Sequence, residues 1–430
     1  MKVALTTLGC KVNTYETEAI WEQLKMKGFT RVDFNEFADL YVINTCMVTN
    51  TGEAKSRQMI RHPLKLNPNA ILVVMGCLAE LNPDSIAVIE QVKVMVGTKD
   101  RERIPDLLDE YLKTGVKQLL VTPLEKNEPY DLLKVTDFSH QHRAFLKIED
   151  GCDNFCSYCI IPYARGRVRS KPKARVLEEA KELGMRHAEI ILTGIHTGGY
   201  GADLPNYKFA DLLEDLGRIQ EINRIRISSI EINELTERVI GIIASSEQIC
   251  HHLHVPLQSG SDWVLRQMNR KYNTIEYREK IRQLREQIPN LAITTDVIVG
   301  FPGETDQAFE ETCHFVEEIG FSELHVFPFS PRKGTIAASL PAEVPGDIKK
   351  RRVARLIAIG KRLAKRSIQK QIGSILRVIP ERQRLGRLQG HSRNYIQVAF
   401  LGNAEWIGKE VRVRLISENY PLSFGEMLPE

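Results

Sequence analysis

The sequence predicts an α/β protein in three parts: a parallel-sheet α/β domain, a partial (β/α)6 barrel and a small C-terminal β-barrel. Two series of short apolar runs that alternate with amphipathic stretches predict the first two parts, because strands that alternate with helices form parallel sheets. Short strands separated by glycines predict the third part. A length of 430 residues suits about three domains, which we expect at residues 1–120, 138–368 and 371–430.

The first domain should contain parallel strands with helices between them. Apolar runs predict its strands at residues 3–8, 40–44, 71–75 and 92–96, and helical patterns at 15–27 and 52–66. The polar stretch over residues 115–141 contains two prolines, which indicates a connection between domains.

Six strand–helix alternations in about 190 residues predict the barrel. Its expected strands are residues 144–149, 188–192, 224–228, 252–255, 291–299 and 323–327. Its expected helices include residues 175–183, 210–216, 274–286 and 306–319. A basic helix over 347–371 should follow, and then strands at 374–379, 395–400 and 410–416.

Composition excludes several classes of protein. Apolar residues are 43% and charged residues 27%, as in ordinary globular proteins, which excludes low-complexity, collagen and coiled-coil chains. The longest apolar run, near residues 71–75, is far shorter than the roughly 18 residues of a membrane span. We therefore expect a cytoplasmic protein without membrane contact. Eight cysteines are too few for a disulfide scaffold.

The net charge of +4 does not by itself indicate nucleic-acid binding, but the charge is unevenly placed. Residues 348–393 contain 15 lysines or arginines and one acidic residue, Glu381. Such a segment is either a solvated face or a surface that contacts phosphates. The small β-barrel beside it favours the second interpretation.

The strongest chemical motif is a group of three cysteines within eight residues: Cys152, Cys156 and Cys159. Three thiolates at this spacing can hold one face of an iron–sulfur cube, whose closed form needs four protein ligands. No fourth cysteine lies nearby, so one iron would stay open to another ligand. The alternatives are a structural zinc site and three free thiols.

This spacing after a strand resembles the radical S-adenosylmethionine superfamily. The resemblance implies a [4Fe–4S] cluster whose open iron binds S-adenosylmethionine, and a carbon radical formed when the reduced cluster cleaves that molecule. It also implies that the barrel is the catalytic core.

A second set of cysteines is spread over the first domain. Cys10, Cys46 and Cys77 each follow a predicted strand. The carboxyl ends of parallel strands share one edge of a sheet, so these thiols can converge there. The alternative is three buried cysteines of the core.

The wider pattern resembles the methylthiotransferases of this superfamily. Its segments are residues 8–13, 43–46 and 74–77 in the first domain, 254–262 and 299–304 in the barrel, and 390–395 in a C-terminal part similar to the RNA-binding TRAM domain. The resemblance implies a second [4Fe–4S] cluster on Cys10, Cys46 and Cys77, whose open iron presents the sulfur for transfer.

Residues 9–18, 46–50 and 55–58 are most similar to the enzymes that methylthiolate C2 of N6-threonylcarbamoyladenosine at position 37, in the anticodon loop of tRNA. This implies tRNA, an electron donor such as a flavodoxin or ferredoxin, and a sulfur source as partners. The alternatives are a methylthiotransferase for isopentenyladenosine or for a ribosomal-protein aspartate, a non-enzymatic iron–sulfur RNA-binding module, and a zinc-stabilised scaffold.

Residues that end predicted barrel strands are candidates for contact with S-adenosylmethionine, because barrel active sites form there. They are Tyr158, Thr193, Gly194, Ser228, Glu231, Gln258, Val299 and Gly300. A role in a turn or in packing is about as plausible for each. The basic residues that follow the cysteine motif are either solvated or in contact with RNA at the barrel mouth: Arg165, Arg167, Arg169, Lys171 and Lys173. His252 and His254 share one strand face, as core histidines or as metal ligands.

Overall fold

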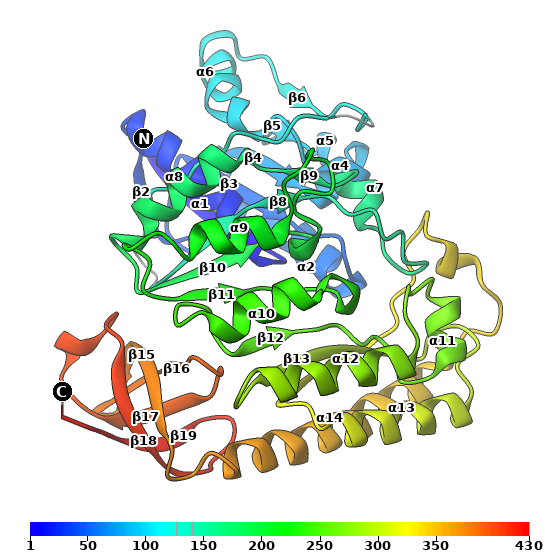
Figure 1. The fold of residues 1–430 in the computed structure, drawn as a ribbon. Coiled ribbons are helices and arrows are strands. Elements are labelled where there is room, and N and C mark those ends of the chain that lie inside the picture. Colours follow the sequence, from blue (N-terminus) through cyan, green and yellow to red (C-terminus); the bar gives the residue numbers. More distant parts are fainter. Residues whose placement is uncertain (126–127, 139–141, 430) are drawn as a thin grey trace.

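The computed structural model describes residues 1–125, 128–138 and 142–429 and has the predicted three-part α/β architecture (Figure 1). An N-terminal sheet domain lies above an open barrel, and a small closed barrel lies at the opposite end. Residues 126–127 and 139–141 of the predicted connection, and residue 430, lie outside the described residues.

The N-terminal domain is built on a six-stranded parallel sheet of order β2-β1-β3-β4-β5-β6. Its strands are β1 (Lys2–Thr7), β2 (Thr30–Val32), β3 (Leu40–Thr45), β4 (Ile71–Gly76), β5 (Val92–Val96) and β6 (Gln118–Leu120). The four predicted strands are all present. The sequence pattern missed β2 and β6 because these edge strands have three residues each and no fully buried position.

Helices cover both faces of this sheet, as expected for a parallel sheet. They are α1 (Lys11–Met26), α2 (Asn50–Arg61), α3 (Pro63–Leu66), α4 (Cys77–Leu81), α5 (Asp84–Ala87), a 3-10 turn η1 (Arg101–Arg103) and α6 (Ile104–Thr114). Alternate strand residues enter two separate cores: Val3 and Leu5 pack on one side of the sheet, and Ala4 packs on the other.

The open barrel consists of two three-stranded parallel sheets, β11-β10-β7 and β12-β13-β14, which meet at a bridge between Ser229 and His254. Its strands are β7 (Arg143–Lys147), β10 (Glu189–Thr193), β11 (Ile225–Ile227), β12 (His252–His254), β13 (Ala292–Val299) and β14 (Glu323–Pro328). A short antiparallel pair, β8 (Glu149–Asp150) and β9 (Arg169–Ser170), flanks the cysteine motif. The six barrel strands therefore form the predicted partial barrel.

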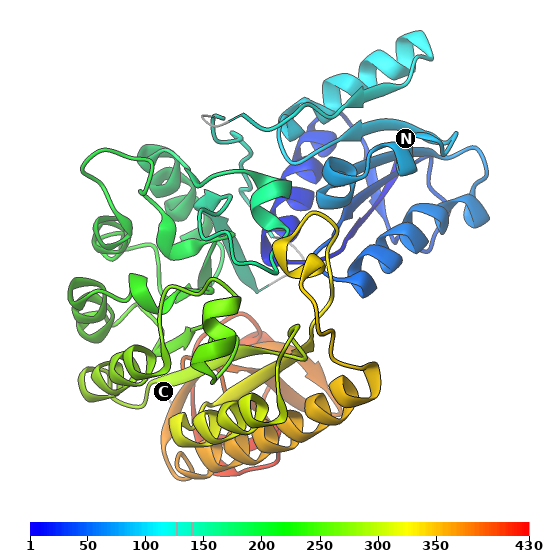
Figure 2. The same ribbon diagram turned by 90° about the vertical axis from the view of Figure 1, so that its right-hand side faces the viewer.

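Most helices of this part lie on the outer side of the barrel (Figure 2), but the first, Ile161–Arg165, packs against helix α4 of the N-terminal domain. The helices are α7 (Ile161–Arg165), α8 (Lys173–Gly184), α9 (Phe209–Leu216), α10 (Glu237–Ser245), α11 (Asp262–Gln267), α12 (Thr274–Gln287), α13 (Asp306–Ile319) and α14 (Gly346–Gln369), with 3-10 turns η2 (Thr197–Gly199), η3 (Ile232–Glu234) and η4 (Ile336–Ser339). Helix α13 begins where the Thr305 hydroxyl caps the Ala308 amide and ends at Gly320 in the left-handed region. Helix α14 packs on β14 and leads into the closed barrel.

The C-terminal part is a closed barrel of order β15-β16-β17-β19-β18. Its elements are β15 (Ile375–Arg384), β16 (Arg387–Ser392), β17 (Gln397–Leu401), a 3-10 turn η5 (Ala404–Trp406), β18 (Val411–Ser417) and β19 (Ser423–Met427). The sequence pattern predicted three of these five strands. Closure removes the exposed edges that short antiparallel strands would otherwise leave.

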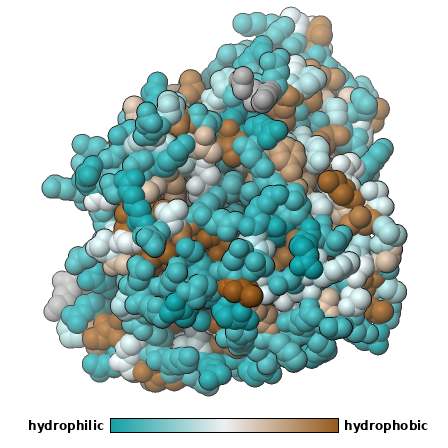
Figure 3. All heavy atoms as spheres, turned by 45° about the vertical axis from the view of Figure 1, so that its right-hand side comes forward, coloured by the Kyte–Doolittle hydropathy of each residue, from teal (hydrophilic) through white to brown (hydrophobic). Residues whose placement is uncertain are grey.

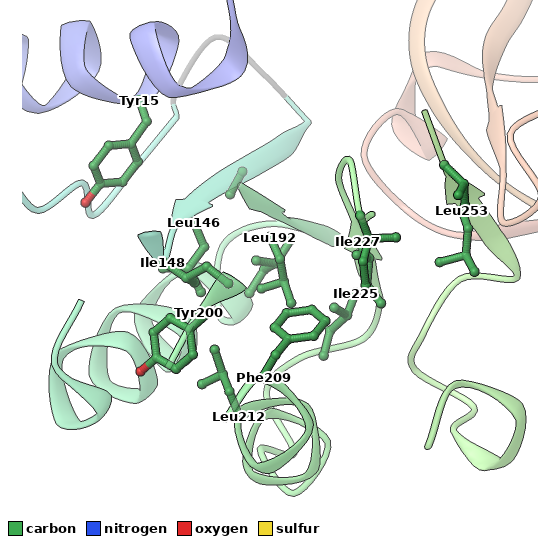
Figure 4. Packing of buried hydrophobic residues seen from close by; sticks show 14 of the residues in the cluster. Tyr15, Leu146, Ile148, Leu192, Tyr200, Phe209, Leu212, Ile225, Ile227 and Leu253 are labelled. Carbon is green, nitrogen blue, oxygen red and sulfur yellow. The ribbon is translucent and has the colours of Figure 1, made fainter. Parts of the chain in front are cut away.

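Helix α1 joins the N-terminal domain to the barrel in one continuous core. Tyr15 is fully buried, and its hydroxyl donates to Glu179 on α8, 2.8 Å away. Figure 4 shows Tyr15 on the α1 side of the barrel sheet, and Leu192 pointing toward Phe209 on the other side. The two domains are therefore fixed relative to each other by packing, which also fixes the sites that they carry.

The surface is mostly hydrophilic on the face shown in Figure 3, with apolar residues in small separate patches. Scattered apolar residues of this kind are normal on a protein surface. Among the described residues, no helix combines the length and the apolar character that a membrane crossing requires.

Candidate active site

The thiols of Cys10, Cys46 and Cys77, here called the sheet trio, lie at the carboxyl ends of β1, β3 and β4. These strands are adjacent and parallel, with Thr45 in register with Gly76. A Cβ atom on Gly9 would lie 3.0 Å from the Cys46 sulfur, and Gly9 has φ +103°, so only glycine fits this close approach. The structure therefore brings these three strand ends together.

Polar contacts hold the loops of the sheet trio. The Asn13 side chain donates to the carbonyls of Leu8 (2.7 Å) and Thr45 (3.1 Å), which ties the ends of β1 and β3 to α1. Burial raises the pKa of the Cys77 thiol to about 12, with Arg165 opposing that shift and Cys46 adding to it. Burial also raises the pKa of the Cys46 thiol, and negative charge on Cys10 raises it further. The three thiols are thus close enough for charge on one to raise the pKa of another.

Arg165 stands beside the sheet trio although it comes from the barrel. It is fully buried, and it donates to Asn13 (2.7 Å), Glu16 (2.8 Å) and Asp150 (2.9 Å). Lys147 joins the same carboxylates at 2.9 and 2.6 Å. Burial alone would raise the pKa of Glu16, but the surrounding cations hold it well below its usual range. This buried ion network links the two domains.

The network corrects one expectation from the sequence. Arg165, Arg169 and Lys171 are buried, so the prediction of a solvated or RNA-facing basic segment is wrong for them. They face inward because buried carboxylates, among them Asp150 and Glu179, pair with them. Arg167 and Lys173 are half-exposed, as expected.

Cys152, Cys156 and Cys159, here called the loop trio, lie between β8 and α7. The turn is closed by a hydrogen bond from the Cys159 amide to the Cys156 carbonyl (2.9 Å). Burial raises the pKa of the Cys159 thiol to about 12, and Cys156 adds to that shift. Arg270 lies across this loop: it donates to the Cys156 sulfur at 3.3 Å and pairs with Glu231.

The donor sets suit iron–sulfur clusters better than a single zinc ion. Zinc holds thiolates about 2.3 Å away, so sulfurs that share one zinc lie within about 4 Å of each other. Among the described residues, three ligating atoms lie within 4.8 Å of one another at His254, Asp296 and His325, and neither cysteine trio forms such a group. Three thiols that are more widely spread leave room for a cube of iron and sulfide. Burial raises the pKa of Cys46, Cys77, Cys152 and Cys159, so binding of iron by these thiols would release protons.

A cavity of about 1300 Å³ lies where the three parts of the chain meet. The N-terminal domain lines it with Gly9, Cys10, Lys11, Val12 and Val48, and the open barrel with Thr193, Gly194, Ser228, His254 and His325. The closed barrel contributes His391, Tyr395 and Tyr420. Three of the residues predicted to contact S-adenosylmethionine, Thr193, Gly194 and Ser228, thus share a cavity with Cys10.

The other predicted contact residues lie elsewhere. Glu231 borders a separate hollow of about 60 Å³ together with Cys156 and Arg270. The remaining four, Tyr158, Gln258, Val299 and Gly300, line neither hollow.

These four residues have packing or backbone roles in the structure. Tyr158 packs against a core that includes Phe301. Gln258 has φ +66°, and its amide donates to the Asp296 carbonyl. Val299 is fully buried, and a Cβ on Gly300 would meet the Lys349 side chain at 2.4 Å.

Sequence reasoning missed the docking role of the segment 390–395. Tyr395 stacks on His252, with ring centres 4.5 Å apart, and on the guanidinium of Arg226. Arg224 and Arg226 also donate to backbone carbonyls of this segment. Glu189 pairs with both arginines, and Glu410 also pairs with Arg224. The segment therefore fastens the closed barrel to the open barrel. His252 is a buried residue of this contact, whereas His254 faces the cavity beside Asp296 (3.2 Å).

Comparisons with known proteins agree with this architecture. Residues 2–97 match the family described as Uncharacterized protein family UPF0004, and residues 146–316 match the Radical SAM superfamily. The Threonylcarbamoyladenosine tRNA methylthiotransferase MtaB of Bacillus subtilis is 45% identical over 433 residues, which cover 99% of this chain and 96% of that protein.

Two further similarities are informative. A tRNA-2-methylthio-N(6)-dimethylallyladenosine synthase of Clostridium botulinum is 34% identical over 96% of this chain and 94% of that protein. Among solved structures, the radical S-adenosylmethionine methyltransferase TsrM of Kitasatospora setae has a TM-score of 0.59 at 14% identity and covers 78% of this chain and 77% of that chain. At that identity the structural likeness supports the fold alone.

Proposed function

The chain belongs to the radical S-adenosylmethionine methylthiotransferase family, and on this premise we propose that it attaches a methylthio group to C2 of N6-threonylcarbamoyladenosine at position 37 of tRNA. The observation that carries the proposal is that Cys10 of the sheet trio and the strand-end residues Thr193, Gly194 and Ser228 line the same cavity. The near full-length similarity to the Bacillus subtilis enzyme supports the choice of base.

Membership of the radical S-adenosylmethionine superfamily implies a [4Fe–4S] cluster and S-adenosylmethionine. The loop trio would hold that cluster, and the sheet trio would hold a second one that presents the sulfur. When bound, these groups supply one-electron chemistry, which can replace a C–H hydrogen that is neither acidic nor attached to an electrophilic carbon. The protein's contribution is to fix the two sites relative to each other and to admit the base between them.

We assign a part of this task to each domain. Residues 1–120 carry the sheet trio, residues 138–368 carry the loop trio and the strand ends, and residues 371–430 hold the RNA. The buried network around Arg165 keeps the first two domains in one orientation. The contacts of Tyr395 keep the third in place.

The outer face of the closed barrel offers a surface for the RNA backbone. Arg377 of β15 stands directly opposite Arg412 of β18, and Arg414 lies two residues further along the same strand. All three are exposed, and within the part of the chain that the structure describes none makes an ion pair. Like charges directly opposite on a sheet repel each other. Phosphates of the anticodon stem would relieve that repulsion and hold the RNA by its shape and charge.

The nucleoside profile of tRNA tests the proposal directly. Deletion of the gene should remove 2-methylthio-N6-threonylcarbamoyladenosine from total tRNA and leave the unmodified N6-threonylcarbamoyladenosine in its place, as measured by mass spectrometry. Return of the gene should restore the product. Loss of a 2-methylthio-isopentenyladenosine signal instead would assign the enzyme to another base. A profile that does not change would contradict an action on tRNA.

A further inference from the structure

Lys11 is the first residue of helix α1 and directly follows Cys10. It lines the large cavity and is exposed to it. Within the described residues its ammonium makes neither a hydrogen bond nor an ion pair, unlike Arg165 and Lys147, which both pair with Glu16. Lys11 is thus a cation in the wall of the cavity without an ion-pair partner in the part of the chain that the structure describes.

Arginines and carboxylates surround Lys11, but the carboxylates pair with the arginines. Burial and the positive charges of Arg226 and Arg143 lower the pKa of Lys11, and the charges of Glu189 and Cys10 act in the opposite direction. The carboxylates of this region are engaged by arginines, Glu189 by Arg224 and Arg226 and Glu381 by Arg143, and none of them pairs with Lys11 among the described residues. An anionic group of a ligand in the cavity can therefore reach the Lys11 ammonium without displacing a carboxylate of the protein.

We infer that the Lys11 ammonium binds the carboxylate of the threonylcarbamoyl group on the substrate base and so selects this base among modified adenosines. The inference rests on the proposed function, which supplies the base. A carboxylate held by an ammonium forms a charge-assisted hydrogen bond, which is stronger than a neutral one. An isopentenyl group is apolar and offers nothing to such a cation.

The position of Lys11 fits the shape of the base. The carbamoyl N–H of the substituent can close a six-membered hydrogen-bonded ring onto N1 of the adenine, which turns the amino-acid part toward the edge that carries C2. C2 must approach the sheet trio to receive sulfur. A cation next to Cys10 therefore lies on the side of the base where the carboxylate arrives.

The test measures binding to the anaerobically reconstituted enzyme. Two anticodon stem-loop RNAs are compared: one carries N6-threonylcarbamoyladenosine, and the other carries the same base with its carboxylate capped as a methylamide. The wild-type enzyme should bind the acid roughly tenfold more tightly than the amide, the loss expected when a hydrogen bond to a charged group is removed. Lys11→Gln should bind both RNAs equally, near the affinity of the wild type for the amide.

Two further variants make the result specific. Lys11→Arg keeps the charge and should keep a preference for the acid. Lys25→Gln removes an exposed lysine at the far end of the same helix and should behave as wild type. Iron content and the unfolding midpoint of each variant show whether it is folded and loaded.

The inference is overturned if Lys11→Gln still prefers the acid, or if the wild type shows no preference. It is also overturned if Lys11→Gln raises the KM for S-adenosylmethionine while the acid preference stays, because the carboxylate bound by Lys11 would then be that of the cofactor. The proposed function fails by a different result: a wild-type enzyme that methylthiolates neither RNA.

Discussion

The two cysteine trios are assembled in opposite ways along the chain. The loop trio occupies eight consecutive residues, and its geometry is set by one turn. The sheet trio comes from three strand ends, separated by 36 and 31 positions along the chain. The loop trio thus depends on one loop and on the segment 267–270 of the same domain that binds it, whereas the sheet trio depends on the register of a whole sheet and on groups brought by another domain.

The arginine beside each trio also differs in origin: one comes from the same domain and the other from a different domain. Arg270, which contacts the loop trio, comes from the barrel itself and carries its own counter-ion, Glu231. Arg165, which faces the sheet trio, reaches it across the domain boundary and is held by carboxylates from both domains. The sheet trio should therefore be more sensitive than the loop trio to substitutions at the domain interface.

The largest effects should separate the tasks of the two trios. Cys152→Ala should abolish cleavage of S-adenosylmethionine, because the loop trio loses a ligand of the cluster that starts the reaction. Cys46→Ala should leave that cleavage measurable but stop methylthio transfer to the RNA. Anaerobic assays of 5′-deoxyadenosine and of modified nucleoside measure the two steps in one reaction mixture.

Cys250→Ala is the matched control for these substitutions, because Cys250 is buried but belongs to neither trio. It should keep both activities. Identical behaviour of the Cys152 and Cys46 variants, with intact folding, would mean that the two trios do not divide the work.

A second substitution tests the dependence of the sheet trio on the barrel. Arg165→Gln leaves Glu16 and Asp150 buried without one of their main cations, which should cost about 3–5 kcal/mol of the free energy of unfolding. It should also lower the iron content by about half, since the sheet trio loses its support while the loop trio remains. Denaturant unfolding and iron analysis of the purified protein measure both quantities.

Arg167→Gln provides the comparison for Arg165→Gln. Arg167 is two residues away and half-exposed, and its pair with Asp153 is a surface ion pair. Its removal should change the free energy of unfolding by no more than about 1 kcal/mol and leave the iron content unchanged. An equal loss of stability in both variants would remove the case for a special role of the buried network.

The same contrast explains what the sequence could predict. The loop trio was evident from spacing alone, and the apolar runs located the main strands of all three parts. The edge strands β2 and β6 escaped because they are short and carry no buried position. The inward orientation of Arg165 escaped because its partners, Glu16 and Asp150, are 149 and 15 positions away, and only the fold brings them together.

The smallest effects should arise on the closed barrel, where charge is unpaired rather than buried. Arg412→Gln removes one of two opposed arginines, so the free energy of unfolding should stay equal or rise slightly, by a few tenths of a kcal/mol. Affinity for tRNA should nevertheless fall, and the slope of its logarithm against the logarithm of salt concentration should decrease by about 1, as for the loss of one phosphate contact.

Arg362→Gln on α14 is the control, because Glu317 already neutralises that exposed arginine and its loss should leave the salt slope unchanged. An equal change of the salt slope in both variants would mean that the RNA contacts the whole basic surface and that the Arg377–Arg412 pair has no special role. A change in Arg412→Gln alone would mean that the phosphates bind where the protein leaves arginines without ion pairs.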